Sequence, residues 1–220
     1  MKKIAVVIAL FLAGAVNGFA QEAPKLYTLP SPFERYTHYL ATARFMGSMP
    51  LGSFADSYVN KASFQNASIS IEWVLRNSPL SIGGEIGSTY FQKRIPRATY
   101  QNGDETISAV QTRTLSQYPV ELFANYHFLG KNSTIQPYVQ VSAGISIVDY
   151  NLYYGSLSTQ HQKIAPKYGV GLGSKFLFKQ DGKFGVDVRV KYDGTSYKHE
   201  YIEKGVSSIN GSIGVFYRWW

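Results

Sequence analysis

The sequence predicts an all-β protein, an eight-stranded antiparallel up-and-down transmembrane β-barrel. Three observations lead to this fold class. Apolar and polar residues alternate in eight segments of strand length, and no sustained helical period follows residue 20. Short turns alternate with longer polar connections along the chain. Charged and small residues share the less apolar face, which suits the narrow interior of a small membrane barrel.

The first 20 residues have the composition of a secretory signal peptide. Lys2 and Lys3 form a positive start, residues 4–16 are apolar, and small residues occupy a cleavage site that ends at Ala20. This pattern predicts cleavage after Ala20, because the apolar run is too short to span a membrane comfortably. The chain has no Cys, which excludes disulfides and a lipid-modified amino terminus.

The rest of the chain divides into two predicted parts. Residues 21–35 contain three prolines and predict an extended periplasmic lead-in, and residues 36–220 form the predicted barrel. Loss of Lys2 and Lys3 with the signal peptide lowers the formal net charge from +8 to +6. This mild basicity is not gathered into a stripe, so no nucleic-acid partner is expected.

The first four predicted strands are residues 36–46, 64–76, 79–92 and 106–128. The first carries Arg44 on its less apolar face, and the third carries Glu85 there and Tyr90 on the other face. The second alternates clearly, with Ile69, Ile71, Trp73 and Leu75 opposing Ser68, Ser70 and Glu72. The fourth sets Val120, Leu122, Ala124, Tyr126 and Phe128 against Glu121, Phe123, Asn125 and His127.

The last four predicted strands are residues 134–148, 164–179, 183–194 and 205–219. The fifth opposes Val139, Val141, Ala143, Ile145 and Ile147 to Tyr138, Gln140, Ser142, Gly144 and Ser146. The sixth opposes Tyr168, Val170, Leu172, Phe176 and Phe178 to Gly169, Gly171, Gly173 and Lys175. The seventh opposes Phe184, Val186, Val188, Val190 and Tyr192 to Gly185, Asp187, Arg189 and Lys191. The eighth opposes Ile209, Gly211, Ile213, Val215, Tyr217 and Trp219 to Asn210, Ser212, Gly214, Phe216 and Arg218.

The connections between these strands differ in length. Short turns are predicted near residues 77–78, 130–133 and 180–182, and longer polar loops over 47–63, 93–105, 149–163 and 195–204. An even strand number then places both termini at the short-turn end, as in barrels with short periplasmic turns and long extracellular loops.

Alternation alone does not say which face of the sheet is wet, because a soluble lipocalin-like barrel turns its apolar face inward. The less apolar face carries ten charged residues, together with many Gly and Ser: Arg44, Glu72, Glu85, Arg113, Glu121, Lys175, Asp187, Arg189, Lys191 and Arg218. A soluble surface would be richer in Lys and Glu and poorer in Gly. Aromatic residues also lie near the ends of the apolar face, as in interfacial girdles. Both features favour lipid outside and charge inside.

The predicted interior charges have two interpretations. They form either an ion path or a structural network that satisfies buried groups and fixes strand register, and the structural interpretation is favoured. Gly169, Gly171 and Gly173 then make room for bulky inward neighbours such as Phe123 or Tyr138. They do not form a phosphate-binding loop, because no helix follows them.

At this point the chain resembles the small outer-membrane β-barrel family, the OmpA-like and OmpW-like eight-stranded domains. The resemblance rests on the signal peptide, the strand set, the segments PYVQVSAG and YGVGLGSKF, and the closing Tyr217-Arg218-Trp219-Trp220. It implies a Gram-negative outer-membrane location, with periplasmic termini and with outer-membrane lipids as partners. It also implies that the terminal strand, through Tyr217, Trp219 or Trp220, is recognised by the barrel assembly machinery.

The sequence gives no sign of catalysis, so we expect no enzyme, no metal and no cofactor. The four His match neither a nucleophile elbow nor a zinc motif. A lipid A-modifying enzyme is the alternative, for which Asp149, Ser156 and His161 are the available residues. His127 is predicted to point inward as a hydrogen-bonded structural residue.

The loops carry the remaining candidate site. Arg94, Arg97, Lys198 and Lys204 could contact lipopolysaccharide phosphates, and loop tyrosines could bind an extracellular protein. We therefore expect an integral outer-membrane barrel with a structural, envelope-integrity or surface-interaction role. A small-solute or hydrophobic-compound channel is the alternative, and a soluble periplasmic lipocalin-like binder is less favoured.

Overall fold

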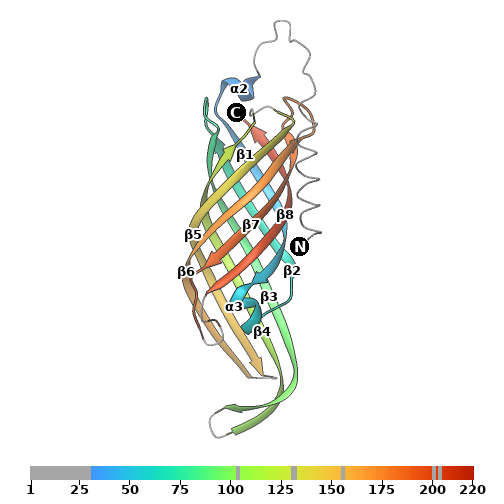
Figure 1. The fold of residues 1–220 in the computed structure, drawn as a ribbon, viewed down its shortest axis with the longest axis vertical. Coiled ribbons are helices and arrows are strands. Elements are labelled where there is room, and N and C mark those ends of the chain that lie inside the picture. Colours follow the sequence, from blue (N-terminus) through green and yellow to red (C-terminus); the bar gives the residue numbers. More distant parts are fainter. Residues whose placement is uncertain (1–30, 103–104, 130–132, 155–156, 200–201, 203–204) are drawn as a thin grey trace. The chain divides into compact units, whose positions relative to one another are not determined.

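A computed structural model describes residues 31–102, 105–129, 133–154, 157–199, 202 and 205–220 (Figure 1). The predicted signal peptide and residues 21–30 of the predicted lead-in lie outside these residues. The elements in chain order are α2 (Pro32–Arg35), β1 (His38–Leu51), α3 (Gly52–Ser57), β2 (Ser63–Val74), β3 (Leu80–Asn102), β4 (Glu105–His127), β5 (Ile135–Tyr154), β6 (Leu157–Leu177), β7 (Phe184–Thr195) and β8 (Val206–Trp219).

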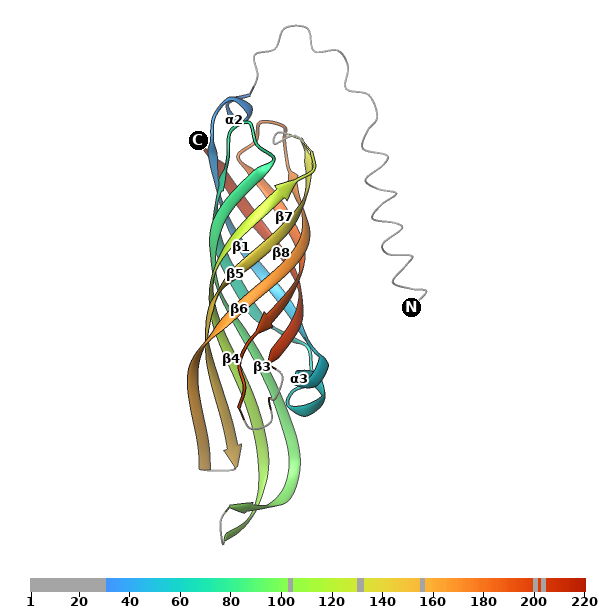
Figure 2. The same ribbon diagram turned by 60° about the vertical axis from the view of Figure 1, so that its left-hand side comes forward.

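The predicted fold class is confirmed. Each strand pairs antiparallel with the next, and β8 pairs with β1, so the sheet closes into an up-and-down barrel (Figures 1 and 2). Within the closed part, each strand has a partner on both sides for its backbone groups, which a sheet surrounded by hydrocarbon requires. No helix within the described residues is long and apolar enough to cross a membrane.

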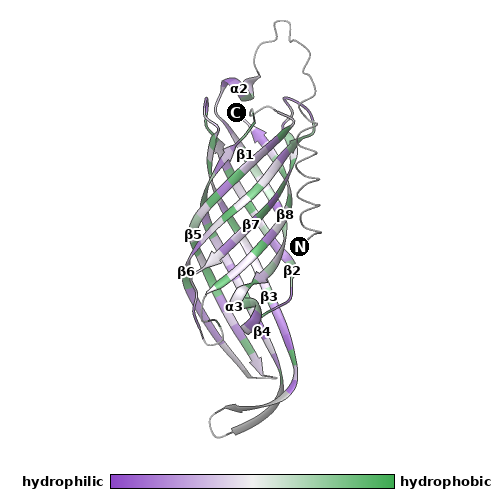
Figure 3. Cartoon of the chain, viewed as in Figure 1, coloured by the Kyte–Doolittle hydropathy of each residue, from purple (hydrophilic) through white to green (hydrophobic). Residues whose placement is uncertain are grey.

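The two faces of the sheet have the predicted orientation. On β2, Ile69 and Ile71 are more than half exposed, whereas Ser70 and Glu72 between and beside them are fully buried. Figure 3 shows the resulting alternation of hydrophobic and hydrophilic residues along the strands. The apolar side chains therefore cover the outside of the barrel, and the polar side chains fill it.

Aromatic rings form a continuous row on the outer face at the short-turn end. Tyr39 stacks between Trp73 and Trp219, at 6.3 and 5.7 Å between ring centroids. Tyr217 stacks on Trp219 at 5.8 Å and contacts Phe184 at 5.0 Å. The row crosses β2, β1, β8 and β7, as an interfacial aromatic girdle would.

Two of the predicted long loops are strands. β3 and β4 stay paired up to Asn102 and Glu105, and β5 and β6 up to Tyr154 and Leu157, so residues 93–102, 149–154 and 157–163 belong to the sheet. Beyond the ends of β2 and β7, these four strands project as one sheet (Figures 1 and 2). The prediction was wrong because the polar-inside alternation does not continue here: the inner face of β5 becomes apolar at Tyr150 and Leu152, and residues 158–164 of β6 are exposed on both faces.

The predicted lead-in also differs from an extended segment in its last residues. Pro32–Arg35 form a single helical turn, because Pro32 suits the first helical position and the Ser31 side chain caps the turn by accepting from the Phe33 N–H at 3.3 Å. The short turns agree with the prediction near Asn77 and Asp181, which adopt positive φ angles of 54° and 64°.

Candidate functional site

The lumen holds a stack of buried ion pairs, which begins near the short-turn end. Lys175 donates to both carboxylate oxygens of Glu72, at 2.6 and 2.7 Å. Ser81 donates to Glu72 at 2.5 Å, and His127 Nε2 lies 3.0 Å from Ser81 Oγ and 3.3 Å from Glu72 Oε1. The Lys175 ammonium also lies 4.9 Å from the centre of the Tyr138 ring. His127 thus has the inward, hydrogen-bonded position that the sequence predicts.

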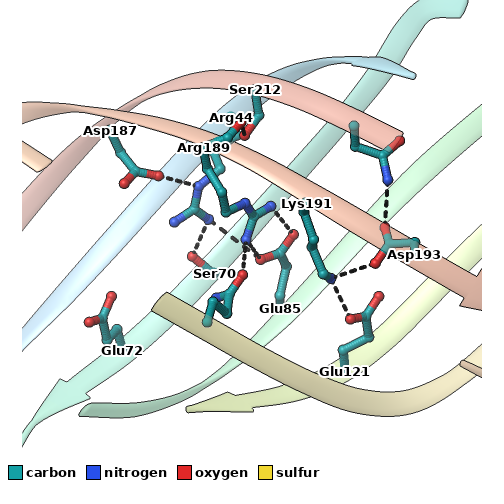
Figure 4. A network of polar contacts seen from close by, with 12 residues as sticks. Arg44, Ser70, Glu72, Glu85, Glu121, Asp187, Arg189, Lys191, Asp193 and Ser212 are labelled. Carbon is teal, nitrogen blue, oxygen red and sulfur yellow. Dashed lines mark hydrogen bonds and ion pairs between the residues drawn. The ribbon is translucent and has the colours of Figure 1, made fainter. Parts of the chain in front are cut away.

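The next layer joins β1 to β7 (Figure 4). Arg44 Nε donates to Asp187 at 2.6 Å, and its Nη1 donates to Ser70 at 2.7 Å. Tyr138 donates to the other oxygen of Asp187 at 2.9 Å. Arg44 also approaches Glu85, at 3.6 Å, so this layer is linked to the one above it.

The upper layers contain three further carboxylates with two cations each. Arg189 donates to both oxygens of Glu85, at 2.6 and 2.8 Å, in the bidentate geometry that favours this pair. Glu121 accepts from Lys191 at 2.6 Å and lies 3.0 Å from Lys167. Both lysines also approach Asp193, at 3.1 and 3.3 Å (Figure 4).

These buried charges balance among the described residues. The acids are Glu72, Glu85, Glu121, Asp187 and Asp193, and the bases are Arg44, Lys167, Lys175, Arg189 and Lys191. Loss of one partner would leave a buried charge without compensation, which costs roughly 3–5 kcal/mol. The layers therefore form an electroneutral network that ties together strands far apart in the sequence.

A small cavity lies within the network. It is lined by Glu121, Lys167 and Asn210 among others and has a volume of about 10 Å³, which is about the room that one water molecule occupies. Leu40, Val74, Leu177 and Phe216 form a small apolar cluster toward the short-turn end. In the part of the chain that the structure describes, ion-paired and apolar side chains thus occupy the lumen.

The projecting end of the barrel has an apolar core of its own. Phe54 and Tyr58, from α3 and its end, pack with Tyr150 and Leu115 on the inner face of the projecting sheet, together with Tyr197 from the segment after β7. The Tyr58 hydroxyl donates to the carbonyl of Thr114 at 3.0 Å, and its ring stacks on Tyr150 at 5.1 Å. This mouth core closes the second end of the lumen.

Of the ten charged residues predicted for the lumen, eight lie in the ion-pair layers. Arg113 lies at the mouth instead, where it donates to the Ser57 carbonyl at 2.9 Å and covers the Tyr58 ring at 5.7 Å. The reason is the length of β4, which carries Arg113 past the last ion-pair layer. Arg218 is buried at the short-turn end and donates to the Gly182 carbonyl at 2.5 Å.

Sequence reasoning missed two charged members of the network, Lys167 and Asp193, and it did not assign polar partners to Tyr138 and Asn210, which it placed on the inward face. Lys167, Asp193, Tyr138 and Asn210 all have buried polar groups that contact charged residues. The alternation could have predicted both charged residues. Lys167 lies an even number of residues from the inward Gly169 and Lys175, and Asp193 lies two residues from the inward Lys191. Gly173 makes room for Tyr138, since a Cβ there would lie 2.5 Å from the Tyr138 ring, and Phe123 occupies the space beside Gly83 instead.

The loop residues predicted to contact lipopolysaccharide do not form one cluster among the described residues. Arg94 and Arg97 are exposed on β3, whereas Lys198 follows β7, beside His199, whose ring stacks on His161 of β6 at 4.4 Å. β4 and β5 separate β3 from β6. Lys204 lies outside the described residues.

The terminal aromatic residues have different surroundings. Tyr217 and Trp219 belong to the outer aromatic row, whereas the Trp220 ring contacts Phe33 at 5.0 Å. Trp220 thus lies beyond the lipid-facing register, as the sequence indicates, and turns toward α2.

The structure brings no acyl-transfer site together from the residues considered. Asp149 accepts from Gln160 at 3.0 Å, His161 stacks on His199, and Ser156 lies outside the described residues. Ser81, His127 and Glu72 do meet, but Ser81 donates to Glu72, and Glu72 approaches the same His nitrogen as Ser81 does. A catalytic triad needs the acid on the opposite ring nitrogen.

Comparisons with known proteins agree on the fold. No family model and no curated protein matches the chain. Neisserial surface protein A has a TM-score of 0.50 and 16% identity, over 82% of this chain and 96% of that one. A major outer membrane protein of Thermus thermophilus has a TM-score of 0.57 and 9% identity, over 84% and 100% of the two chains. The chain therefore has the fold of the small eight-stranded outer-membrane β-barrels.

Proposed function

We propose that this chain is an integral barrel of a Gram-negative outer membrane, with periplasmic termini, that serves envelope integrity and surface interaction and not solute passage. The observation that carries the proposal is the charged lumen, in which five acids and five bases pair around a cavity of about 10 Å³. A hydrated solute needs a continuous aqueous path, which such an interior does not offer.

Conductance of the full-length mature barrel in planar lipid bilayers tests this proposal. We expect no stable ohmic current of porin size, and no swelling of liposomes in small sugars. A general porin in the same membrane serves as the positive control. A steady porin-sized conductance would overturn the proposal and favour the channel alternative.

The projecting sheet supports the surface-interaction part of the proposal. β3 and β6 form its two edges, because β2–β3 pairing ends at Ser88 and β6–β7 pairing begins at Lys167. Side chains 158–164 of β6 are exposed on both faces. A stiff sheet of this kind, held away from the bilayer, would present a surface to an extracellular protein.

Lipopolysaccharide is the proposed lipid partner at this end of the barrel. Arg94, Arg97 and Lys198 are exposed cations near the projecting sheet, and cations attract the phosphates of lipid head groups. Replacing Arg94, Arg97, Lys198 and Lys204 by Gln should weaken lipopolysaccharide binding to the purified barrel. Replacing Arg76 and Lys179, which are exposed at the other end, by Gln is the control. Equal binding by both variants would reject the assignment.

The terminal strand supports a second proposed partner, the barrel assembly machinery. Tyr217 and Trp219 lie on its outer face, where a partner protein could contact them during insertion. Replacing both by Ala should lower insertion in a reconstituted assembly reaction more than it lowers spontaneous folding into detergent. An equal loss in the two reactions would count against recognition.

A further inference from the structure

The short-turn end of the barrel is closed by a segment outside the sheet. β1 and β8 close the barrel by pairing with each other, Tyr39 opposite Trp219 and Leu40 opposite Arg218. α2 directly precedes β1, and Trp220 directly follows β8. Any contact between α2 and the last residues of the chain therefore crosses the β1–β8 seam.

Phe33 of α2 makes such contacts on both sides of the seam. Its side chain is buried, with 1% of its surface exposed. The ring meets His38 at the start of β1, 5.3 Å between centroids, and Trp220 after β8, 5.0 Å, both edge to face. The guanidinium of Arg218 on β8 lies 3.7 Å from the ring centre. Aromatic pairs and cation–π contacts of this geometry are favourable, most of all when they are shielded from water.

The helical turn itself could not persist without these contacts. Ser31 caps it, its carbonyl accepting from the Glu34 and Arg35 N–H groups at 3.0 Å, and the Tyr36 N–H donates to the Pro32 carbonyl at 2.9 Å. A single turn of this kind is unstable in isolation, because nucleation fixes several residues for few hydrogen bonds. The burial of Phe33 therefore stabilises the helical turn of α2, and that turn positions the Phe33 ring at the seam.

The same contacts include the turn between β6 and β7. Arg218 Nε donates to the Gly182 carbonyl at 2.5 Å, and its backbone N–H donates to the Lys183 carbonyl at 2.7 Å. The Lys183 ammonium lies 5.0 Å from the centre of the Trp220 ring. Phe33, Arg218, Trp220 and this turn thus form one connected cluster.

We propose that α2 is a clasp that holds the β1–β8 seam shut, with Phe33 as its anchor and Trp220 as its partner. Trp219 ends the lipid-facing aromatic row, and Trp220 belongs to the clasp. The first and last strands of a closed sheet are joined only after both have formed, so a contact across their ends slows the opening of the barrel. The proposal concerns barrel closure and is independent of the proposed function.

The unfolding half-time of the mature barrel, measured by gel band shift in hot SDS, tests the clasp. Because Phe33→Ala empties a buried site that bridges the seam, the half-time should fall at least about tenfold. Tyr36→Ala is the matched control, since Tyr36 lies in the same segment but is 53% exposed, and it should change the half-time by less than about twofold. Equal half-times for Phe33→Ala and the wild type would overturn the proposal.

Two further measurements separate a clasp from a general loss of stability. Trp220→Ala should shorten the half-time less than Phe33→Ala does, because Trp220 is 56% exposed and Phe33 also contacts His38 and Arg218. The double variant should add little to Phe33→Ala, because the contact between the two rings is already lost in that variant. Hydrogen exchange of the Phe33→Ala barrel should rise in β1 and β8 and not in β4 and β5. Exchange that rises equally around the barrel, or additive half-times, would refute seam closure. If Phe33→Ala fails to fold, Phe33→Leu takes its place, and a wild-type half-time for it has the same refuting force.

Discussion

Arg189 on β7 holds Glu85 on β3 across the lumen through two parallel hydrogen bonds of 2.6 and 2.8 Å. The two residues are 104 positions apart in the sequence, and neither is on a strand next to the other's. The pair therefore links opposite walls of the barrel. It also favours the observed strand register, because a one-residue slip of either strand would turn its charge out toward the lipid.

Glu85→Gln should destabilise the barrel strongly, because Arg189 would lose its bidentate partner while remaining buried. We expect a loss of roughly 3–5 kcal/mol in the free energy of unfolding, measured as a lower urea midpoint in lipid vesicles. The double variant Glu85→Gln/Arg189→Met removes the stranded cation and should recover part of the loss. A double variant that is less stable than Glu85→Gln alone would contradict this account.

Gly173→Ala should destabilise the barrel through overpacking. A Cβ at this position would lie 2.5 Å from the Tyr138 ring, and Tyr138 cannot move freely because it donates to Asp187. Forced rearrangements of this kind cost about 1–3 kcal/mol. Gly211→Ala is the control, since nothing lies within 4 Å of its added Cβ. Urea titration of the two variants should show a lower midpoint for Gly173→Ala only, and the reverse order would refute the steric argument.

Tyr58→Ala should loosen the mouth core without opening the barrel. The change removes a fully buried ring and its hydroxyl bond to Thr114, a local loss of roughly 3–5 kcal/mol by analogy with other buried aromatic residues. Trypsin should then cut faster after the exposed Lys61, while the folded band persists on unheated gels. Tyr153→Ala, at a 39% exposed side chain, should leave the cutting rate unchanged. Equal rates for both variants would show that Tyr58 does not hold this segment.

The sequence predicts the transmembrane part of this fold well, because lipid outside and charge inside impose a strict alternation on each strand. Glu72, Asp187 and Arg189 could be assigned to the lumen from parity alone. Their partners could not be assigned, because pairing across the lumen depends on the stagger of strands that are not neighbours. Lys175 joins Glu72 on β2, for example, and Arg189 joins Glu85 on β3.

The parts of the chain outside the bilayer were predicted less well, and for a physical reason. The inner face becomes apolar at Tyr150 and Leu152 of β5, and residues 158–164 of β6 are exposed on both faces, so 149–154 and 157–163 read as a loop although β5 and β6 remain paired there. Arg113 illustrates the consequence. Its position in the alternation of β4 points inward, but it lies further along the strand, beside Tyr58 in the mouth core. The helical turn of α2 is held by Phe33 through contacts with residues at the far end of the sequence.

Leu122→Arg tests the orientation of the whole sheet. Leu122 is 75% exposed on β4 and pairs with Ala143 and Gly84 in the middle of the barrel wall. An arginine facing the centre of the bilayer destabilises a barrel by about 2–4 kcal/mol, whereas near the interface the same change costs about 0–1 kcal/mol. Ile164→Arg is the matched control, because Ile164 is 60% exposed on β6 and lies toward the projecting end. In vesicles Leu122→Arg should therefore lower the urea midpoint well below that of Ile164→Arg. Equal midpoints for the two variants, or a mature chain that stays folded in buffer without any amphiphile, would mean that hydrocarbon does not surround this face.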